Sequence, residues 1–376
     1  MPVALSAALF VAGAAVSLAT SYVLVTRLER IGEWLGLSEG LLGVLAALAA
    51  DAPEITSAVA ALTSHQGKIG AGVIIGSNVF NLAALLGLGA VVAGGIALHR
   101  RVVLLGGVVA VWIAAACLVT VLGLIPPAAG LIAVLAVLLP YLVALGAGHA
   151  RLQRLALARR WEAWLAVAVT EEEQELEEVI HPQHGRGRDV AVAAAALAVV
   201  VVASVTMERS ASLLGTHFAV PEIITGGVVL AAVTSLPNAV AAVYLAARGR
   251  GAAMLSTTLN SNALNVTAGL LIPAVVTGLG PPSPQSALIA VWYLVMTLAS
   301  VAFAYRDSGV SRAVGALIIG AYLVFLGSLL ATAHAAAPDP RLTVIPLVVV
   351  AVGAAVGLAR RPGRGRRRER PRPGPP

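Results

Sequence analysis

Residues 43–81 read GVLAALAADAPEITSAVAALTSHQGKIGAGVIIGSNVFN, a stretch that is apolar except for a few polar side chains. Two of these side chains are the carboxylates Asp51 and Glu54, three residues apart in the middle of an apolar run. On insertion scales a single charge at the centre of a membrane helix costs about 2.5–3.5 kcal/mol. A chain that keeps two such charges so close together is expected to use them.

The composition is that of a polytopic membrane protein. Hydrophobic residues make up 59% of the 376 residues and charged residues only 11%, whereas a soluble domain carries about 25% charged residues. The formal net charge is +7, but the arginines lie in short predicted loops and in the tail. The expected partner is therefore the lipid bilayer and not a nucleic acid. The first apolar run follows no basic cluster and no clear small-residue cleavage site, so it is predicted to be a retained helix.

The apolar segments are long enough to cross the membrane, because about 20 helical residues span ~30 Å of hydrocarbon. Lipid offers no hydrogen-bond partners, so each segment is predicted to be a helix. The alternating polar pattern of an outer-membrane barrel is absent. The predicted fold is an all-α polytopic membrane protein whose eleven spans are 3–26, 38–63, 69–95, 102–123, 127–147, 189–208, 222–247, 252–278, 285–305, 311–333 and 342–360.

Lys and Arg residues in the loops indicate the orientation, because cytoplasmic loops are enriched in them. With these spans, 22 of the 25 Lys and Arg residues fall on one side, and Lys68, Arg209 and Arg341 fall on the other. If one helix had been missed, the loops after it would change sides and the division would no longer be so unequal. The prediction is an integral plasma-membrane protein with its N-terminus outside and its C-terminus in the cytoplasm.

Other segments lie between or beyond the two predicted five-helix halves, 1–147 and 189–333. Residues 148–188 are predicted to be a cytoplasmic linker. Its acidic run EEEQELEE lacks the ligand spacing of a calcium loop, so we interpret the run as a solvated helix, with a regulatory cation site as the alternative. The extra span 342–360 precedes a basic tail, 361–376, that is expected to be disordered. The one cysteine, Cys117, lies in an apolar run and is predicted to be a packing residue.

An internal repeat relates the two halves. Gly43-Val44, Pro53, Ser77-Asn78 and Asn81 recur 184 residues later as Gly227-Val228, Pro237, Ser261-Asn262 and Asn265, with no gap. The first copy follows one predicted span and the second follows six, so the two copies enter the membrane in opposite directions. The sequence therefore predicts an inverted 5+5 repeat related by a pseudo-twofold axis in the membrane plane, plus an eleventh helix.

Interrupted helices mark the candidate cation site. Pro53 and Pro237 each lack an N–H, so the carbonyls of Ala49 and Val233 lose their usual helical donor. The carbonyls near Ala47 and Ala231 are expected to be exposed by the kinks, and Gly70, Gly72 and Gly76 are expected to permit close helix packing. Oxygen atoms from such groups suit Na⁺ or Ca²⁺. The candidate ligands are Asp51, Glu54, Ser77, Asn81, Thr234, Ser235, Asn238, Ser261 and Asn265, together with the carbonyls of Ala47 and Ala231.

These motifs make the sequence similar to the cation/calcium exchanger superfamily, whose best-known branch is the sodium/calcium exchangers. Each inverted repeat of that family carries a GTSLPE-like motif followed by a GSNxFN- or GSNxFD-like motif. The first pair here reads AADAPE (49–54) and GSNVFN (76–81), and the second reads VTSLPN (233–238) and NSNALN (260–265). The resemblance implies a ten-helix core and secondary antiport, in which Na⁺ or H⁺ influx drives Ca²⁺ extrusion.

The chain departs from the family pattern at the acidic positions. The family commonly has a glutamate in both repeats, but this chain has Asn238 in the second, and Asp51 stands where the family usually has serine. The two carboxylates can balance one Ca²⁺, two Na⁺ or two protons, and give less support for three Na⁺. We expect sodium/calcium exchange with an altered coupling ratio or ion preference. The alternative is a cation/proton antiporter, coupled to H⁺ or K⁺, because close buried carboxylates repel and one can hold a proton.

Other classes of function fit the sequence less well. A channel would need a repeated pore loop or a ring of carbonyls, and no such pattern is present. A membrane enzyme is the alternative from a different class, but the seven histidines fall near predicted loops or helix ends. The expected ligands are thus the transported Ca²⁺ and Na⁺ (or H⁺), with no resident cofactor. The sequence leaves the oligomeric state open.

Overall fold

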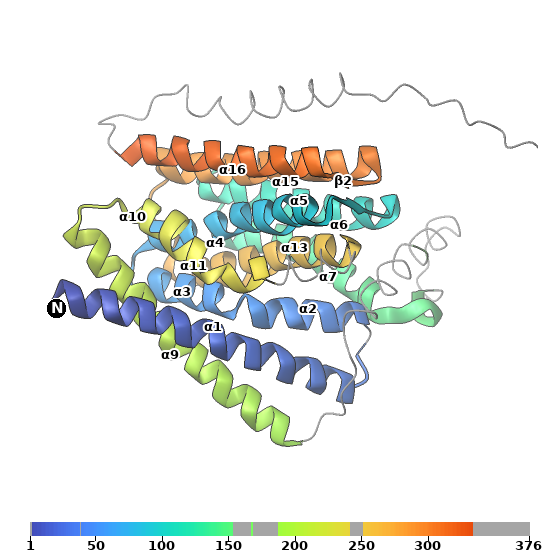
Figure 1. Ribbon diagram of the computed structural model, residues 1–376, viewed down its shortest axis with the longest axis horizontal. Helices are drawn as coiled ribbons and strands as arrows, with labels where there is room; N and C mark the ends of the chain where they lie inside the picture. Colours follow the sequence, from blue (N-terminus) through green and yellow to red (C-terminus); the bar gives the residue numbers. More distant parts are fainter. Residues whose placement is uncertain (1, 38, 153–166, 168–186, 241–250, 334–376) are drawn as a thin grey trace, which may run out of the picture.

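The computed structural model describes residues 2–37, 39–152, 167, 187–240 and 251–333 (Figure 1). The predicted eleventh span at 342–360, the acidic run and the tail at 361–376 lie outside these residues. The first part of the chain forms α1 (Val3–Trp34), α2 (Glu39–Ala50), α3 (Ala52–Thr63), α4 (Gly67–Asn81), the π-helical η1 (Leu82–Leu88), α5 (Gly89–Ala93), β1 (Gly95–Ala97), α6 (Arg100–Val121) and α7 (Pro127–Leu152).

The second part repeats this pattern of long helices and short breaks. It forms α9 (Gly187–His217), α10 (Glu222–Ile224), the π-helical η2 (Thr225–Leu230), α11 (Ala231–Thr234), α13 (Gly251–Leu264), the π-helical η3 (Asn265–Leu271), α14 (Ile272–Thr277), α15 (Pro284–Asp307), β2 (Gly309–Ser311) and α16 (Arg312–Ala333).

The all-helical polytopic fold is confirmed. Among the described residues, eight helices are long and apolar enough to cross a membrane, and a ninth span results if the bent pair Val44–Ala50 and Ala52–Thr63 is counted as one. In the predicted span 222–247 the apolar helix Glu222–Thr234 is short, and the description stops at residue 240. The full count of five plus five plus one helices therefore stays a prediction.

Two helices run well past their predicted ends. The span predicted at 3–26 continues to Trp34, and the span predicted at 189–208 continues to His217. Charges end an apolar run but do not end a helix, since Arg, Lys and Glu are good helix formers. One of these charges pairs across the two helices, because Nη1 of Arg27 lies 2.7 Å from Oδ1 of Asp189.

A short antiparallel ribbon, which the sequence did not predict, joins two loops. In β1 and β2, Ile96 pairs with Val310. The loops lie next to Arg100 and Arg306, and the side chain of Arg100 donates to the Arg306 carbonyl over 3.1 Å. This pairing requires both loops to lie at the same end of the bundle, as the distribution of arginines predicts.

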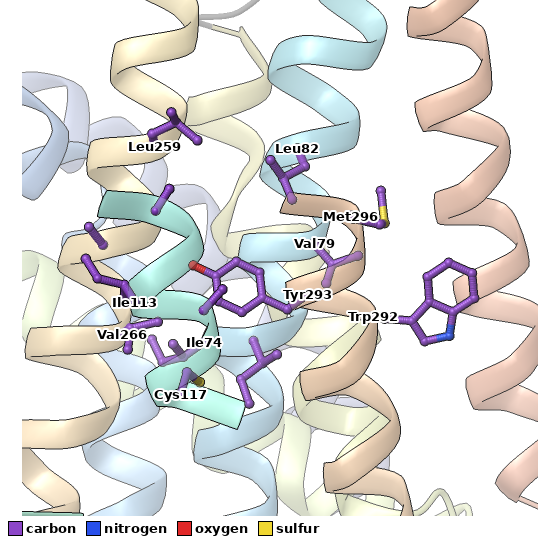
Figure 2. Packing of buried hydrophobic residues seen from close by; sticks show 14 of the residues in the cluster. Ile74, Val79, Leu82, Ile113, Cys117, Leu259, Val266, Trp292, Tyr293 and Met296 are labelled. Atoms are coloured by element: carbon purple, nitrogen blue, oxygen red, sulfur yellow. The ribbon is translucent and has the colours of Figure 1, made fainter. Parts of the chain in front are cut away.

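The helices form layers, with α15 and α16 on one side of the bundle and α1 and α9 on the other (Figure 1). Between them α4 and α13 are central. Their apolar faces pack with α6 and α15 around the ring of Tyr293, and Figure 2 shows Ile113 and Cys117 of α6 beside it. Cys117 is fully buried in this cluster, which confirms that it packs in the core.

The two repeats meet at Asn78 and Asn262, which are equivalent positions. Nδ2 of Asn78 donates to the Asn262 carbonyl over 3.1 Å, and Nδ2 of Asn262 donates to the Asn78 carbonyl over 3.1 Å. Such a reciprocal pair, in which residue i contacts j and j contacts i, is what a twofold relation between two segments produces. The side chains of both residues are buried.

Glycines allow the repeats to approach closely at α4. A Cβ atom on Gly72 would lie 2.8 Å from the Gly227 nitrogen, and one on Gly76 would lie 2.7 Å from the Gly227 Cα. A Cβ on Gly70 would lie 2.6 Å from Leu62. The expectation that these three glycines permit close packing is confirmed. The position equivalent to Gly76 is Asn260, whose side chain instead accepts a hydrogen bond from the Tyr141 hydroxyl at 3.1 Å.

The first prediction concerns Gly76. In the Gly76→Ala variant the new Cβ would press on the Gly227 backbone, which cannot rotate away. We expect the free energy of unfolding in detergent to fall by about 1–3 kcal/mol. The control is Gly320→Ala on α16, where a Cβ meets nothing within 4 Å. A Gly76→Ala variant as stable as the control would contradict the close approach.

The second prediction concerns the reciprocal pair. Asn78→Ala and Asn262→Ala each remove the side-chain donor to the other residue's buried carbonyl, at about 1–3 kcal/mol. Because the residues contact each other, the double variant should cost less than the two single variants together, by at least about 0.5 kcal/mol. The control cycle pairs Asn262→Ala with Thr63→Ala on the exposed end of α3. Strict additivity in the Asn78–Asn262 cycle would contradict the contact.

Candidate cation site

The site begins at a break in the helix that carries the carboxylates. Asp51 lies between α2 and α3, whose axes are bent by 56°. Pro53 cannot donate to the Ala49 carbonyl, and the hydroxyl of Ser21 on α1 donates to that carbonyl instead, over 3.1 Å. The break is thus stabilised from the neighbouring helix, and Asp51 and Glu54 are both fully buried beside it.

The second repeat breaks at the equivalent position. The helix α11 ends at Thr234, and Ser235, which stands 184 residues after Asp51, occupies the turn that follows. Ser235 and Asn238 are buried and face the carboxylates of the first repeat. The two breaks therefore lie opposite each other, one with acidic and one with neutral side chains.

Asp51 is held by neutral donors of the second repeat. Its Oδ1 accepts from Nδ2 of Asn238 over 2.9 Å and from Oγ of Ser261 over 2.7 Å. Its other oxygen, Oδ2, is buried and has no hydrogen-bond partner among the described residues. One acceptor oxygen of Asp51 is therefore available to a ligand.

Glu54 is held in the same way. Its Oε1 accepts from the Ser235 hydroxyl over 2.5 Å and from Nδ2 of Asn238 over 3.4 Å, and its Oε2 accepts from Asn265. Ser77 also lies against this carboxylate. Because the amide of Asn238 reaches both acids, Asp51 and Glu54 face one shared space.

Asparagine side chains close the remainder of this cage, which we define as the buried polar groups around Asp51 and Glu54. Asn81 donates to Oγ of Ser261 over 3.3 Å and accepts from Asn238 over 3.4 Å. Asn265 donates to the side-chain oxygen of Asn78 over 3.1 Å. The Asn265 Oδ1 atom is buried and has no hydrogen-bond partner among the described residues. It is a second acceptor oxygen, besides Asp51 Oδ2, that a cation could take.

Three other predicted ligands, the Thr234 hydroxyl and the carbonyls of Ala47 and Ala231, make hydrogen bonds within their own helices. The Thr234 hydroxyl donates to the Leu230 carbonyl of its own helix over 2.9 Å. The carbonyls of Ala47 and Ala231 accept the N–H groups of Asp51 and Ser235 over 2.9 and 3.1 Å. The kinks therefore do not free these carbonyls, since the helical hydrogen bonds continue up to each break. Each carbonyl retains a second lone pair, so its role as a ligand stays a prediction.

Three residues have contacts that the sequence does not predict. Asn78 and Asn262 were recognised as repeated residues, but their reciprocal bond depends on the relative placement of α4 and α13. Ser21 lies on a helix without a motif, and its sequence gives no sign that it contacts Ala49. A small polar residue inside an apolar span can indicate a contact between helices. Because α1 has several such residues, the sequence does not single out Ser21.

The arrangement can bind a cation through oxygen atoms. All hydrogen bonds to Asp51 and Glu54 within the described part of the chain come from neutral side chains, so nothing there cancels their charge. The described residues contain no group of three or more His, Cys, Asp and Glu side chains arranged for a metal. The cage is instead two carboxylates plus amide and hydroxyl oxygens, a set that suits hard cations such as Ca²⁺ or Na⁺.

Solved structures share the fold. The chain superimposes on a crystal structure of an H⁺/Ca²⁺ exchanger, CAX, with a TM-score of 0.67 and 14% identity, over 94% of this chain and 88% of that one. It also matches the sodium–calcium exchanger NCX_Mj, soaked with 2.5 mM Na⁺ and 10 mM Sr²⁺, with a TM-score of 0.56 and 19% identity, over 87% of this chain and 99% of that one. At these identities the likeness concerns the fold alone.

Curated relatives match over shorter stretches. A putative antiporter, CaxA, of Alkalimonas amylolytica is 34% identical over 87 residues, which are 23% of this chain and 27% of that protein. The sodium/potassium/calcium exchanger 2 of Gallus gallus is 28% identical over 124 residues, 31% of this chain and 19% of that one. The alignments thus span well under half of these relatives.

The sequence profile of the family described as Sodium/calcium exchanger protein matches residues 5–169 and 189–331, which together are most of the chain. The matched regions contain every motif residue of the cage. The members of this family are transporters and not enzymes. The chain is an integral membrane protein that belongs to the family of sodium/calcium exchanger proteins.

Proposed function

We propose that the protein is a secondary active antiporter that exchanges Ca²⁺ for Na⁺, with its N-terminus outside the plasma membrane and its C-terminus in the cytoplasm. The observation that carries the proposal is the cage. Asp51 and Glu54, from the first repeat, are buried and receive hydrogen bonds from Ser235, Ser261 and other neutral groups of the second. Two buried negative charges that have no basic partner in the described part of the chain call for a bound cation or for protons.

The oxygens of the cage support Ca²⁺ as a substrate. Ca²⁺ takes six to eight oxygen ligands at about 2.3–2.6 Å. Asp51 Oδ2 and Asn265 Oδ1 lack partners among the described residues, and Glu54, Asn81 and Asn238 can turn further oxygens inward once a cation displaces their mutual hydrogen bonds. Two carboxylates balance one Ca²⁺ or two Na⁺. Competition of the two ions for the same carboxylates would produce exchange without a second site.

The helices α1 and α9 are suited to move as one unit. They pack along their lengths (Figure 1). Their hydroxyl groups at Ser17 and Ser204 lie 2.8 Å apart, and Arg27 pairs with Asp189 near the other end. Both helices border the break at Asp51 from outside the central layer. We propose that this pair slides or rocks to open the cage to each side of the membrane in turn.

A cation/proton antiporter is the second candidate. The amide of Asn238 contacts both Asp51 and Glu54, so the two carboxylates are close enough to repel each other. Like charges at close range favour a proton on one of them. Proton-coupled or potassium-coupled exchange would use the same two acids.

The third prediction separates the driving ions. The purified protein in liposomes should take up ⁴⁵Ca²⁺ when a Na⁺ gradient directed outward from the liposomes is imposed, and K⁺ or H⁺ gradients alone should drive much less uptake. Uptake driven by the H⁺ gradient alone would favour the second candidate. Absence of uptake under all three gradients would contradict antiport. A clean ratio of three Na⁺ to one Ca²⁺, obtained from reversal potentials, would contradict the assignment of only two carboxylates to the exchange.

The fourth prediction concerns the two acids. Glu54→Gln and Asp51→Asn keep the side-chain shape but remove one negative charge each, so both variants should lose Ca²⁺ uptake. The matched control is Glu222→Gln at the exposed start of α10, which should transport as the unaltered protein does. Retained transport in both cage variants would remove the basis of the proposal.

A further inference from the structure

Glu208 is a third buried carboxylate, and the proposed exchange does not use it. It lies in α9, and only 1% of its surface is exposed. Neither Oε1 nor Oε2 has a hydrogen-bond partner among the described residues. In contrast to Asp51 and Glu54, its carboxylate thus accepts no hydrogen bond from the part of the chain that the structure describes.

The charged groups around Glu208 do not neutralise it by direct contact. Its neighbour in sequence, Arg209, is exposed, and successive residues of a helix point about 100° apart because a turn takes 3.6 residues. The elements packed on α9 are α1, α3 and η2. From Val3 to Ser21, α1 has no titratable side chain, η2 has none, and the only one in α3 is Glu54. His217 and Glu222, towards the end of α9 and just beyond it, are exposed.

A proton suits this place better than a metal ion. Burying an ionised carboxylate without a partner is far more costly than burying the neutral acid. Ca²⁺ needs six or more oxygens, but no described polar group bonds to either oxygen of Glu208, and the neighbouring Met207 packs on Gly13 of α1, which has no side-chain oxygen. The surroundings therefore supply too few oxygens for a metal.

Buried serines lie on the helices between Glu208 and the cage, and one of them bonds α3 to the backbone of α9. Ser204 lies one turn before Glu208, so its carbonyl is the acceptor of the Glu208 N–H in a regular helix. The hydroxyl of Ser57 donates to this same carbonyl over 3.5 Å, and the Ser204 hydroxyl contacts Ser17. Ser57 in turn lies three residues after Glu54, on the same face of α3. All three serines are buried.

We propose that Glu208 is a proton-binding site, separate from the cage, on the α1–α9 helix pair, and that the bond from Ser57 to the Ser204 carbonyl couples α9 to the helix that carries Glu54. The site holds one proton as a neutral carboxylic acid near neutral pH. Because it lies on the pair of helices that the proposed exchange moves, its protonation makes the movement of that pair depend on pH. The proton site itself does not depend on the proposed exchange.

Infrared spectroscopy of the full chain in lipid tests the proton site. The C=O stretching band of a protonated carboxylic acid is distinct from the bands of a carboxylate. We expect the unaltered protein to show such a band near neutral pH, and Glu208→Gln to lose one component of it. Glu208→Asp keeps an acid on a shorter chain, so the component should shift in frequency. Glu222→Gln, which removes an exposed acid, should leave the band unchanged.

An unchanged band in Glu208→Gln would overturn the proposal. If that variant does not fold, an unshifted band in Glu208→Asp would overturn it equally. The link to the cage is tested separately, by the pH dependence of Ca²⁺ flux. In Glu208→Gln the new side chain is neutral at every pH and cannot titrate. Ca²⁺ flux by Glu208→Gln should therefore vary less with pH than flux by the unaltered protein, and an identical pH profile would remove the link. A complete lack of flux in the unaltered protein would instead contradict the exchange and leave the infrared test intact.

Discussion

The structure depends on hydrogen bonds that neutral side chains of one repeat donate to two carboxylates of the other. Ser235, Asn238, Ser261 and Asn265 together satisfy most of the oxygens of Asp51 and Glu54. A buried charge without such donors would be too costly to keep in a membrane protein. The same donors are neutral and do not cancel the charge, so ionised carboxylates in the cage would attract cations, as the proposed exchange requires. In the proposed exchange, stability and ion binding would thus use one set of contacts.

The surrounding fold holds the two breaks opposite each other. The reciprocal bonds of Asn78 and Asn262 fix α4 against α13, and Gly76 lets η2 approach α4 closely. Ser21 satisfies the carbonyl that Pro53 leaves free. An unsatisfied backbone group inside the membrane costs several kcal/mol. These contacts offset part of that cost and so stabilise the interrupted helices. The central helices are therefore held together by direct contacts, and α1 and α9 pack on their side.

Much of the fold and of the cage could be predicted from the sequence, because the patterns that indicate them are either local or repeated in both halves. The length of the apolar runs predicted the helices, and the repeat with its offset of 184 residues predicted that the acids Asp51 and Glu54 would face the neutral Ser235 and Asn238 of the other half. The sequence also predicted the glycines that permit close packing. The expected exposure of the Ala47 and Ala231 carbonyls is not seen, since their helical hydrogen bonds continue to each break, and their role as ligands stays a prediction. Contacts such as Ser21 with Ala49 and the isolation of Glu208 depend on how distant helices cross, which no local pattern records.

The central claim is that a cation binds between the two carboxylates. It is tested most directly by an experimental structure of the protein in saturating Ca²⁺ or Sr²⁺, with anomalous scattering used to locate the ion. The account predicts one peak in the cage, with Asp51 Oδ2 and Asn265 Oδ1 among its ligands at about 2.3–2.6 Å. No peak there at saturating ion, or a peak only outside the cage, would contradict the account.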